Sequence, residues 1–146
     1  MAADEPRRYE LAWIGQRPGA RLHVAEAHRP AVLRWISAGR PAVVRRREAG
    51  CPPGHLGLGI PFPPSWGGAR VALSAPRGTI ERIAPPPRLA EAAPAAPARW
   101  REPIARLAAA LSELGLEPRI HGSLAWQALT GEPYLHPRSD GDLPLR

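Results

Sequence analysis

A Gly-Ser pair followed by two closely spaced aspartates forms the most chemically suggestive group in the chain. Gly122 and Ser123 precede an apolar segment, and Asp140 and Asp142 stand two positions apart near the end of the sequence. Glycine lets backbone approach a ligand closely, and the start of a helix attracts phosphate. Two carboxylates on one side of a strand attract a divalent cation, and ligation by oxygen alone favours Mg²⁺. Together these residues predict phosphoryl or nucleotidyl transfer.

The residues before this group predict two of the elements that must position it. Residues 101–118 predict a helix ending at Gly115, because apolar residues recur at helical spacing at Ile104, Leu107, Leu111 and Leu114. Residues 116–123 predict a short strand that delivers the Gly-Ser pair to the next element.

The residues from Ser123 onward predict a second helix and a final strand. Residues 123–131 favour a helix with Ser123 as its N-cap and Gly131 at its end. Residues 139–146 would form a strand that carries both aspartates. Gly141 and Pro144 weaken that strand, because glycine loosens it and proline restricts it to a sheet edge or a turn.

The first part of the chain predicts a β-rich unit with one helix, so the fold class is α+β: a β-rich N-terminal domain followed by a partial nucleotidyltransferase-type αβ core. Residues 29–40 predict the helix, and β-branched or alternating apolar runs predict strands at 10–15, 41–47, 55–62, 69–75 and 78–84. Residues 85–100 are rich in proline and lack apolar periodicity, which is typical of a linker. The expected domains are 1–90 and 100–146, with 91–99 as a Pro/Ala linker.

Composition limits the other classes of function. The chain carries 20 basic residues against 13 acidic ones, for a net charge of +7, but every basic residue is an arginine and only residues 45–47 form a run. This dispersal and an aromatic content of 5% argue against a nucleic-acid surface and favour phosphorylated small molecules. Cys51 is the only cysteine, so no internal disulfide is expected. Without an apolar run long enough for a membrane span or a signal peptide, we expect a cytoplasmic protein without a membrane partner.

The string HGSLAWQALTGEPYLHPRSDGDL, residues 121–143, carries a family resemblance. Its Gly-Ser pair followed by D-x-D resembles the signature of the polymerase β-like nucleotidyltransferase superfamily. The longer string closely resembles phosphoribosyl-dephospho-CoA transferase, the holo-acyl-carrier-protein synthase of malonate decarboxylase. The upstream pieces AVVRRR, GHLGLGIPFP and PPPRL also resemble the N-terminal domain of that family, so the resemblance covers most of the chain.

The resemblance implies a reaction and a role for the matching residues. The family transfers a phosphoribosyl-dephospho-CoA prosthetic group from a triphosphoribosyl-dephospho-CoA donor to a serine of the acyl carrier protein subunit of malonate decarboxylase, and releases pyrophosphate. Gly122 and Ser123 would hold the donor triphosphate, and Ser123 would be catalytic. Asp140 and Asp142 would be catalytic ligands of Mg²⁺. The cofactor expected from the resemblance is therefore Mg²⁺.

Several neighbouring residues have two possible roles on sequence alone. Arg45, Arg46 and Arg138 are candidates for binding donor phosphates, or they are solvated surface arginines. Trp126 and Tyr134 match the family string and are either core residues or surfaces for stacking an adenine. Gln127 also matches the string without an evident role, and His121 is either a base or a structural histidine.

The resemblance decays within DGDLPLR, residues 140–146, where relatives of the fold continue with further strands, helices and a third metal-binding carboxylate. We therefore expect a truncated or frameshifted copy, or a fragment. Two alternatives to an active transferase follow: a catalytically inactive remnant that only binds carrier protein or donor, and a basic nucleic-acid-binding module. The first is motivated by the absent third carboxylate, and the second by a pI of about 11.3.

Overall fold

The computed structural model describes residues 4–16 and 21–136. The described residues fall into two compact units, the first within Met1–Phe62 and Trp66–Pro85 and the second within Pro63–Ser65 and Pro86–Arg146. The first holds all the strands and the second is helical, which confirms the predicted α+β class. No helix among the described residues is long and apolar enough to cross a membrane.

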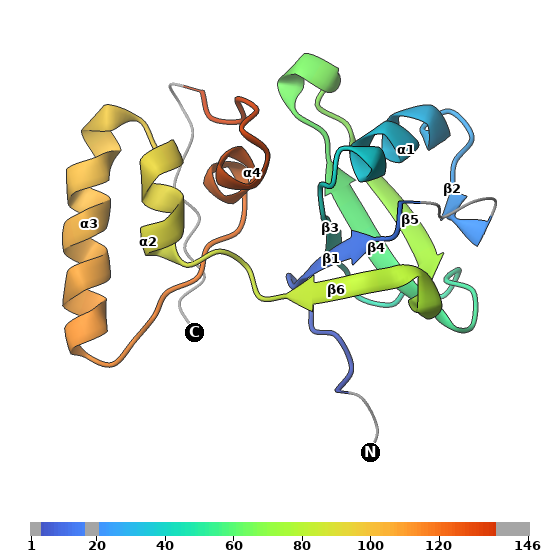
Figure 1. Ribbon diagram of the computed structural model, residues 1–146, viewed down its shortest axis with the longest axis horizontal. Helices are drawn as coiled ribbons and strands as arrows, with labels where there is room; N and C mark the ends of the chain where they lie inside the picture. The colour runs from blue at the N-terminus through green and yellow to red at the C-terminus, as the bar shows by residue number, and fades with distance from the viewer. Residues whose placement is uncertain (1–3, 17–20, 137–146) are drawn as a thin grey trace. The chain divides into compact units, whose positions relative to one another are not determined.

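The first unit is built on a six-stranded antiparallel sheet (Figure 1), in the order β2-β5-β4-β3-β1-β6. The longest pairing joins neighbours in the chain, β4 and β5, over seven residues each. The five strands predicted for this unit are all present, and the two-residue β2 is an addition to them. The bounds are Leu11–Ile14 for β1, His23–Val24 for β2, Ala42–Val44 for β3, His55–Pro61 for β4, Arg70–Pro76 for β5 and Ile80–Ala84 for β6.

Alternation along the paired strands builds the core of this unit. Leu56, Leu58 and Ile60 of β4 are buried, and they pair with Ala75, Leu73 and Val71 of β5. The helix α1, Arg29–Ser37, adds the fully buried Val32 and Trp35. The Trp35 indole donates a 2.9 Å hydrogen bond to the carbonyl of Pro41, so its only polar group is satisfied inside the core.

The α1 helix begins and ends where its sequence predicts. Pro30 stands in its first turn, where the missing N–H costs nothing. Gly39 follows its end with φ at +76°, and its N–H binds the carbonyl of Ile36 at 2.9 Å. This left-handed closure stops the helix and returns the chain to β3.

The second unit contains the helices α2 Leu89–Ala92, α3 Ala98–Glu113 and α4 Ser123–Thr130, with α2 between the other two (Figure 1). Its core is small and half alanine: Leu89, Ala92, Ala96, Ile120, Leu124 and Ala125. Residues 91–99, which we expected to be a linker, hold the end of α2, a turn of 3-10 helix over Ala93–Ala95 and the start of α3. This packing was not predicted because it relies on alanines that show no apolar periodicity. Their small side chains let the segments approach closely.

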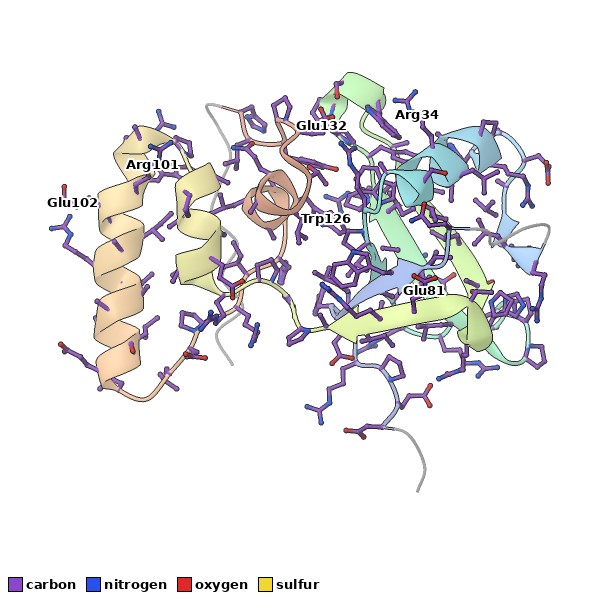
Figure 2. The ribbon with its side chains drawn as sticks, viewed as in Figure 1. Arg34, Glu81, Arg101, Glu102, Trp126 and Glu132 are labelled. Carbon is purple, nitrogen blue, oxygen red and sulfur yellow. The ribbon has the colours of Figure 1, made fainter. Side chains whose placement is uncertain are left out.

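The α3 helix presents a different apolar stripe from the one expected. Leu107 is 39% exposed and Leu114 is 74% exposed, whereas Trp100, Ile104 and Ala108 pack against the core. The stripe thus begins a full turn earlier, and the helix itself starts at Ala98 instead of Arg101. Figure 2 shows Glu102 pointing away from α2 on the outer side of this helix.

The strand expected at residues 116–123 is replaced by a single antiparallel bridge between Arg88 and Arg119. Leu89 donates its N–H to the carbonyl of Pro118 at 2.8 Å, and Ile120 donates to that of Pro87 at 2.9 Å. The two return bonds would need N–H groups on Pro118 and Pro87, which proline lacks. The two prolines therefore stop the ladder at one bridge.

Candidate active site

The start of α4 carries the Gly-Ser pair in an open arrangement. Gly122 is the N-cap, with φ +85° and ψ −162°, and Ser123 is the first helical residue instead of the predicted cap. No side chain caps this end, and the Ser123 hydroxyl makes no hydrogen bond among the described residues. The first N–H groups of a helix have no partner within it, and no backbone acceptor elsewhere in residues 4–16 and 21–136 binds those of α4, which lie beside the half-buried Ser123.

The conformation of Gly122 explains why glycine stands at this position. Its φ and ψ lie in a region that residues with a side chain avoid, so the backbone turn into α4 depends on the missing Cβ. Its carbonyl accepts the first bond of the helix, from the Trp126 N–H at 3.1 Å. The strain-free turn leaves Leu124, Ala125 and Trp126 buried just inside the helix. The open end is therefore anchored by buried side chains of the first turn.

Three of the predicted site residues, Asp140, Asp142 and Arg138, lie outside the described residues, so their predicted roles remain predictions. Within residues 4–16 and 21–136, no group of three or more histidine, cysteine or acidic side chains gathers to hold a metal ion.

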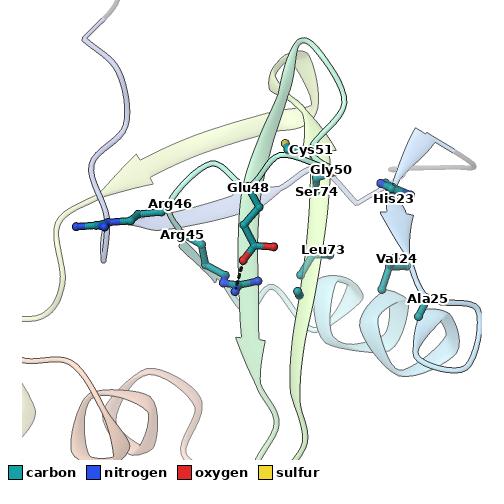
Figure 3. A pocket seen from close by; sticks show the side chains of 12 residues that line it. His23, Val24, Ala25, Arg45, Arg46, Glu48, Gly50, Cys51, Leu73 and Ser74 are labelled. Atoms are coloured by element: carbon teal, nitrogen blue, oxygen red, sulfur yellow. Dashed lines mark hydrogen bonds and ion pairs between the residues drawn. The ribbon is translucent and has the colours of Figure 1, made fainter.

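The other two predicted residues, Arg45 and Arg46, follow β3 in the first unit. They line a cavity of about 240 Å³, together with backbone and side chains of His23, Glu48, Cys51 and Ser74 (Figure 3). Arg45 binds Glu48 at 2.7 Å, and the Arg46 side chain extends away from Glu48. The stem of Arg45 crosses Gly59, where a Cβ would lie 2.9 Å from its Cδ. Arg45 and Arg46 therefore belong to the first unit, and Gly122 and Ser123 belong to the second.

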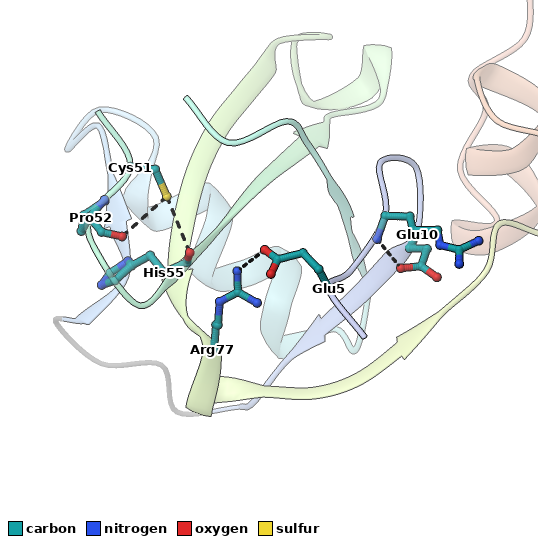
Figure 4. A network of polar contacts seen from close by, with 7 residues as sticks. Glu5, Glu10, Cys51, Pro52, His55 and Arg77 are labelled. Atoms are coloured by element: carbon teal, nitrogen blue, oxygen red, sulfur yellow. Dashed lines mark hydrogen bonds and ion pairs between the residues drawn. The ribbon is translucent and has the colours of Figure 1, made fainter. Parts of the chain in front are cut away.

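The neighbourhood of Cys51 does not form a nucleophile and base pair. The thiol faces the carbonyls of Pro52 and His55 at 3.8 and 3.7 Å (Figure 4). The His55 ring Nδ1 instead lies 3.1 Å from the hydroxyl of the buried Ser74. Cys51 thus lacks the imidazole contact that activates a catalytic thiol.

Gln127 is the functional candidate whose contacts the sequence did not reveal. Its Nε2 donates to the carbonyl of Ala95 at 2.7 Å, and its Oε1 accepts from the N–H groups of Tyr134 and Leu135, each at 3.0 Å. One carboxamide thus holds the segments before α3 and after α4. Only its place in the family string marked it in the sequence. Trp126 and Tyr134, whose alternatives were core packing and adenine stacking, are 6% and 9% exposed.

An exposed ion pair flanks the bridge that precedes α4. Arg88 Nε lies 2.5 Å from Glu91 Oε1, and Arg88 Nη1 lies 3.6 Å from Glu117 Oε1. The hydrogen bond from Arg88 is the main cause that holds the pKa of Glu91 below its ordinary value, and the same pair raises the pKa of Arg88. These charges link residues 88–91 to the segment that leads to Gly122.

The comparisons with known proteins match both units. Residues 7–86 match the family model of the phosphoribosyl-dephospho-CoA transferase MdcG N-terminal domain, and residues 88–146 match that of its C-terminal domain. The chain therefore belongs to a family of transferase enzymes. It is a member of the phosphoribosyl-dephospho-CoA transferase family, as its resemblance predicted.

Individual relatives agree with the family models. The chain is 39% identical over 136 residues to phosphoribosyl-dephospho-CoA transferase of Xanthomonas campestris pv. campestris strain 8004, and 40% identical over 137 residues to that of Xanthomonas axonopodis pv. citri. Both alignments cover 93% of the chain and 63% of the relative. The same named enzyme of Bradyrhizobium diazoefficiens is 41% identical over 88 residues, which are 60% of this chain and 39% of the relative. No solved structure matches the chain significantly.

Proposed function

We propose that this chain catalyses transfer of the phosphoribosyl-dephospho-CoA group from triphosphoribosyl-dephospho-CoA to a serine of the acyl carrier protein subunit of malonate decarboxylase. The observation that carries the proposal is the open start of α4, where Gly122 and Ser123 leave backbone and hydroxyl donors without a capping side chain. This arrangement suits an anionic phosphate chain. The family membership of both units supports the same reaction.

In the proposed reaction, the serine hydroxyl of the carrier attacks the phosphorus that bears the ribosyl 5″-oxygen. A new phosphorus–oxygen bond forms, the bond to the bridging oxygen of the leaving pyrophosphate breaks, and the serine proton passes to solvent. The first N–H groups of α4 and the Ser123 hydroxyl would hold the triphosphate against rotation and offset its charge. Arg45, Arg46 and Arg138 are the proposed further contacts to donor phosphates.

The donor set of Asp140 and Asp142 fits Mg²⁺, because two carboxylates at i and i+2 offer hard oxygen ligands and leave positions for water and phosphate. These residues would hold the ion, which would stabilise negative charge on the entering and leaving oxygens when bound. The relatives are longer than this chain, which spans 63% of their length, so activity of the chain itself is part of the proposal.

The test is the intact mass of the apo carrier protein after incubation with the chain, Mg²⁺ and the donor. We expect a mass gain equal to the prosthetic group. In the double variant Asp140→Asn, Asp142→Asn, the rate should fall at least about 100-fold, because lost metal charge stabilisation costs several kcal/mol.

The matched control for this variant is Asp4→Asn, which changes the only other aspartate of the chain. Asp4 is exposed and lies 3.8 Å from Arg7 in the first unit, so the control should transfer at the wild-type rate. Normal transfer by the double variant would remove the assigned metal role. A folded wild-type chain that binds donor without a mass gain would instead make this chain a binding protein.

A further inference from the structure

The cavity of the first unit lies on the face of the sheet that points away from the core. Alternation along β4 turns Leu56 and Leu58 into the core, so Gly57 faces the other side. Ser74 of β5 pairs with Gly57, and both residues line the cavity of about 240 Å³. Since one water molecule needs about 10–15 Å³ of such space, the cavity has room for a phosphate or pyrophosphate group.

Two long, nitrogen-bearing side chains stand at the ends of one row of residues across this face. Arg45 donates its N–H to the carbonyl of Gly57 at 3.0 Å, which places the two residues opposite each other. Gly57 pairs with Ser74, and Ser74 pairs with His23 of β2. Neighbouring strands lie about 4.8 Å apart, so three spacings separate the backbones at Arg45 and His23 by roughly 14 Å. Between them the floor carries only a glycine and a serine.

The side chain of Arg45 is held on this face by its neighbours. Its stem crosses Gly59, where a Cβ would lie 2.9 Å from the arginine Cδ, so this path depends on glycine. Its Nη2 lies 2.7 Å from Oε1 of Glu48 (Figure 3), and the two side chains are 40% and 64% exposed. Exposed ion pairs of this kind add little stability. A more highly charged anion can therefore displace the Glu48 carboxylate at small cost.

The floor of the cavity also holds a buried polar group. Ser74 is only 5% exposed, and its hydroxyl lies 3.1 Å from Nδ1 of His55. A hydroxyl offers one donor and two acceptor positions, and His55 occupies one of these three. When the imidazole donates through Nδ1, the hydroxyl hydrogen is free to bind an anion in the cavity. Ser74 can thus add a donor to those of the Arg45 guanidinium.

We propose that this cavity binds a phosphate group of a small molecule, with Arg45 as the main contact, Ser74 as a second donor and Glu48 as an internal competitor. The Glu48 carboxylate already binds the guanidinium, which shows the charge that Arg45 recognises. Phosphate matches the arginine fork in a bidentate way and carries more charge than one carboxylate, so it should replace Glu48. That the bound group belongs to the transferase donor rests on the proposed function, whereas the site itself does not.

The test is a titration of the isotope-labelled chain with inorganic pyrophosphate in a buffer free of phosphate, followed by NMR. We expect the amide signals of Gly57, Ala72 and Ser74 to shift with one common Kd. The same spectra report on Gly122 and Ser123, where the proposed function places the donor triphosphate. Shifts at the cavity alone would support this inference and count against that role of α4. Shifts at Gly122 and Ser123 alone would overturn the inference and leave the proposed function standing.

Two variants should change binding at the cavity in opposite directions. Arg45→Met should weaken it by about 10-fold or more, because hydrogen bonds between charged groups are lost. Glu48→Gln should strengthen it by about 2- to 5-fold, because an exposed ion pair no longer competes. Wild-type affinity in Arg45→Met would overturn the role of Arg45. Weaker binding by Glu48→Gln would overturn the competition, since the carboxylate would then be holding Arg45 in place.

The matched controls are Arg77→Met and Glu5→Gln. These residues form an ion pair in the same unit, with side chains 40% and 75% exposed, and neither lines the cavity. Both variants should bind pyrophosphate with the wild-type Kd. Changes equal to those of Arg45→Met and Glu48→Gln would mean that net charge alone governs binding, and the proposed site would be wrong.

Gly59→Ala tests the position of the guanidinium separately from its charge. The variant keeps every charged group, but its Cβ would lie 2.9 Å from the Arg45 Cδ, so the arginine must move and part of the affinity should be lost. Gly78→Ala, whose Cβ would meet open space, is its control and should bind normally. Unchanged binding by a folded Gly59→Ala would contradict the fixed path of Arg45.

Acetate is the last probe, because it separates phosphate from carboxylate recognition. We expect acetate to leave the cavity signals in place at concentrations where pyrophosphate saturates them. If acetate shifts the signals of Gly57, Ala72 and Ser74 at those concentrations, the site recognises a carboxylate and the assignment to phosphate is wrong.

Discussion

The two units hold their shape by different means. The first buries large side chains between a sheet and a helix, with Trp35, Leu58 and Ile60 each at most 1% exposed. The second has a core of six residues, three of them alanine, and its longest helix, α3, buries no residue fully. Because apolar burial stabilises in proportion to area, the first unit gains more stability from its core than the second does.

The second unit compensates with specific polar contacts at its turns. The bridge at Arg88 and Arg119, the carboxamide of Gln127 and the left-handed Gly131 each fix one segment against another. Such contacts fix the direction of the backbone at a turn, and each adds little net stability. The comparison teaches that the candidate active site lies in the unit that is specified by hydrogen bonds and backbone conformation, and depends less on a large core.

The largest expected effect is in the first unit, with Trp35→Ala. The change removes a fully buried indole that contacts Phe62 and Trp66 edge-on, and leaves the Pro41 carbonyl without its donor. We expect a loss of about 3–5 kcal/mol in the free energy of unfolding. Chemical denaturation gives the total, and hydrogen exchange should show the loss at amides of β4 and β5.

Trp13→Ala is the matched control, since Trp13 lies on β1 half-buried under the guanidinium of Arg82 at 3.9 Å. Its smaller buried area predicts a smaller loss. Equal losses for the two variants would contradict the assignment of the core to Trp35. If amide exchange in Trp35→Ala became faster only in α4, the proposal that the first unit depends more on its core than the second would be wrong.

The next effect belongs to the second unit, with Gly122→Ala. A side chain at φ +85° and ψ −162° is strained, so we expect a loss of about 1–3 kcal/mol together with a displaced start of α4. Gly131→Ala is the control, because its φ of +73° and ψ of −2° lie in the left-handed region and its Cβ would meet open space. Gly131→Ala should therefore cost less. The reverse order, measured by thermal unfolding, would remove the special role of Gly122.

Much of the first unit was predictable because its residues alternate or cluster in ways that only one element accommodates. The β4 run HLGLGIP shows its buried face by simple alternation, and Gly59 leaves space for the side chain of Arg45. The two-residue β2 escaped prediction because a pair of residues carries no period. It exists through its pairing with β5, a contact distant in sequence.

The second unit was harder to read because its packing uses alanine and its backbone bonds involve proline. Both features look like a linker, and residues 91–99 were interpreted as one. The helix at 123–131 was predicted from its end at Gly131, but its start was misread, since a serine beside a glycine suggests a side-chain cap. The contacts of Gln127 join residues seven and eight positions apart across a turn and also reach Ala95, which no local pattern encodes.

The smallest expected effect tests whether surface charge contributes to the second unit, with Glu91→Gln. The folded state lowers the pKa of Glu91, so the pair with Arg88 stabilises fully above the ordinary glutamate pKa and loses its effect as pH falls through the lowered value. The melting temperature of wild type should exceed that of the variant slightly near neutral pH, and the difference should vanish once the pH is well below the lowered pKa of Glu91. Glu102→Gln, on the exposed side of α3, is the matched control for the loss of one surface carboxylate in the same unit. A difference that persists in acid would mean that Glu91 acts through packing, because the protonated carboxyl and the amide are then alike in charge.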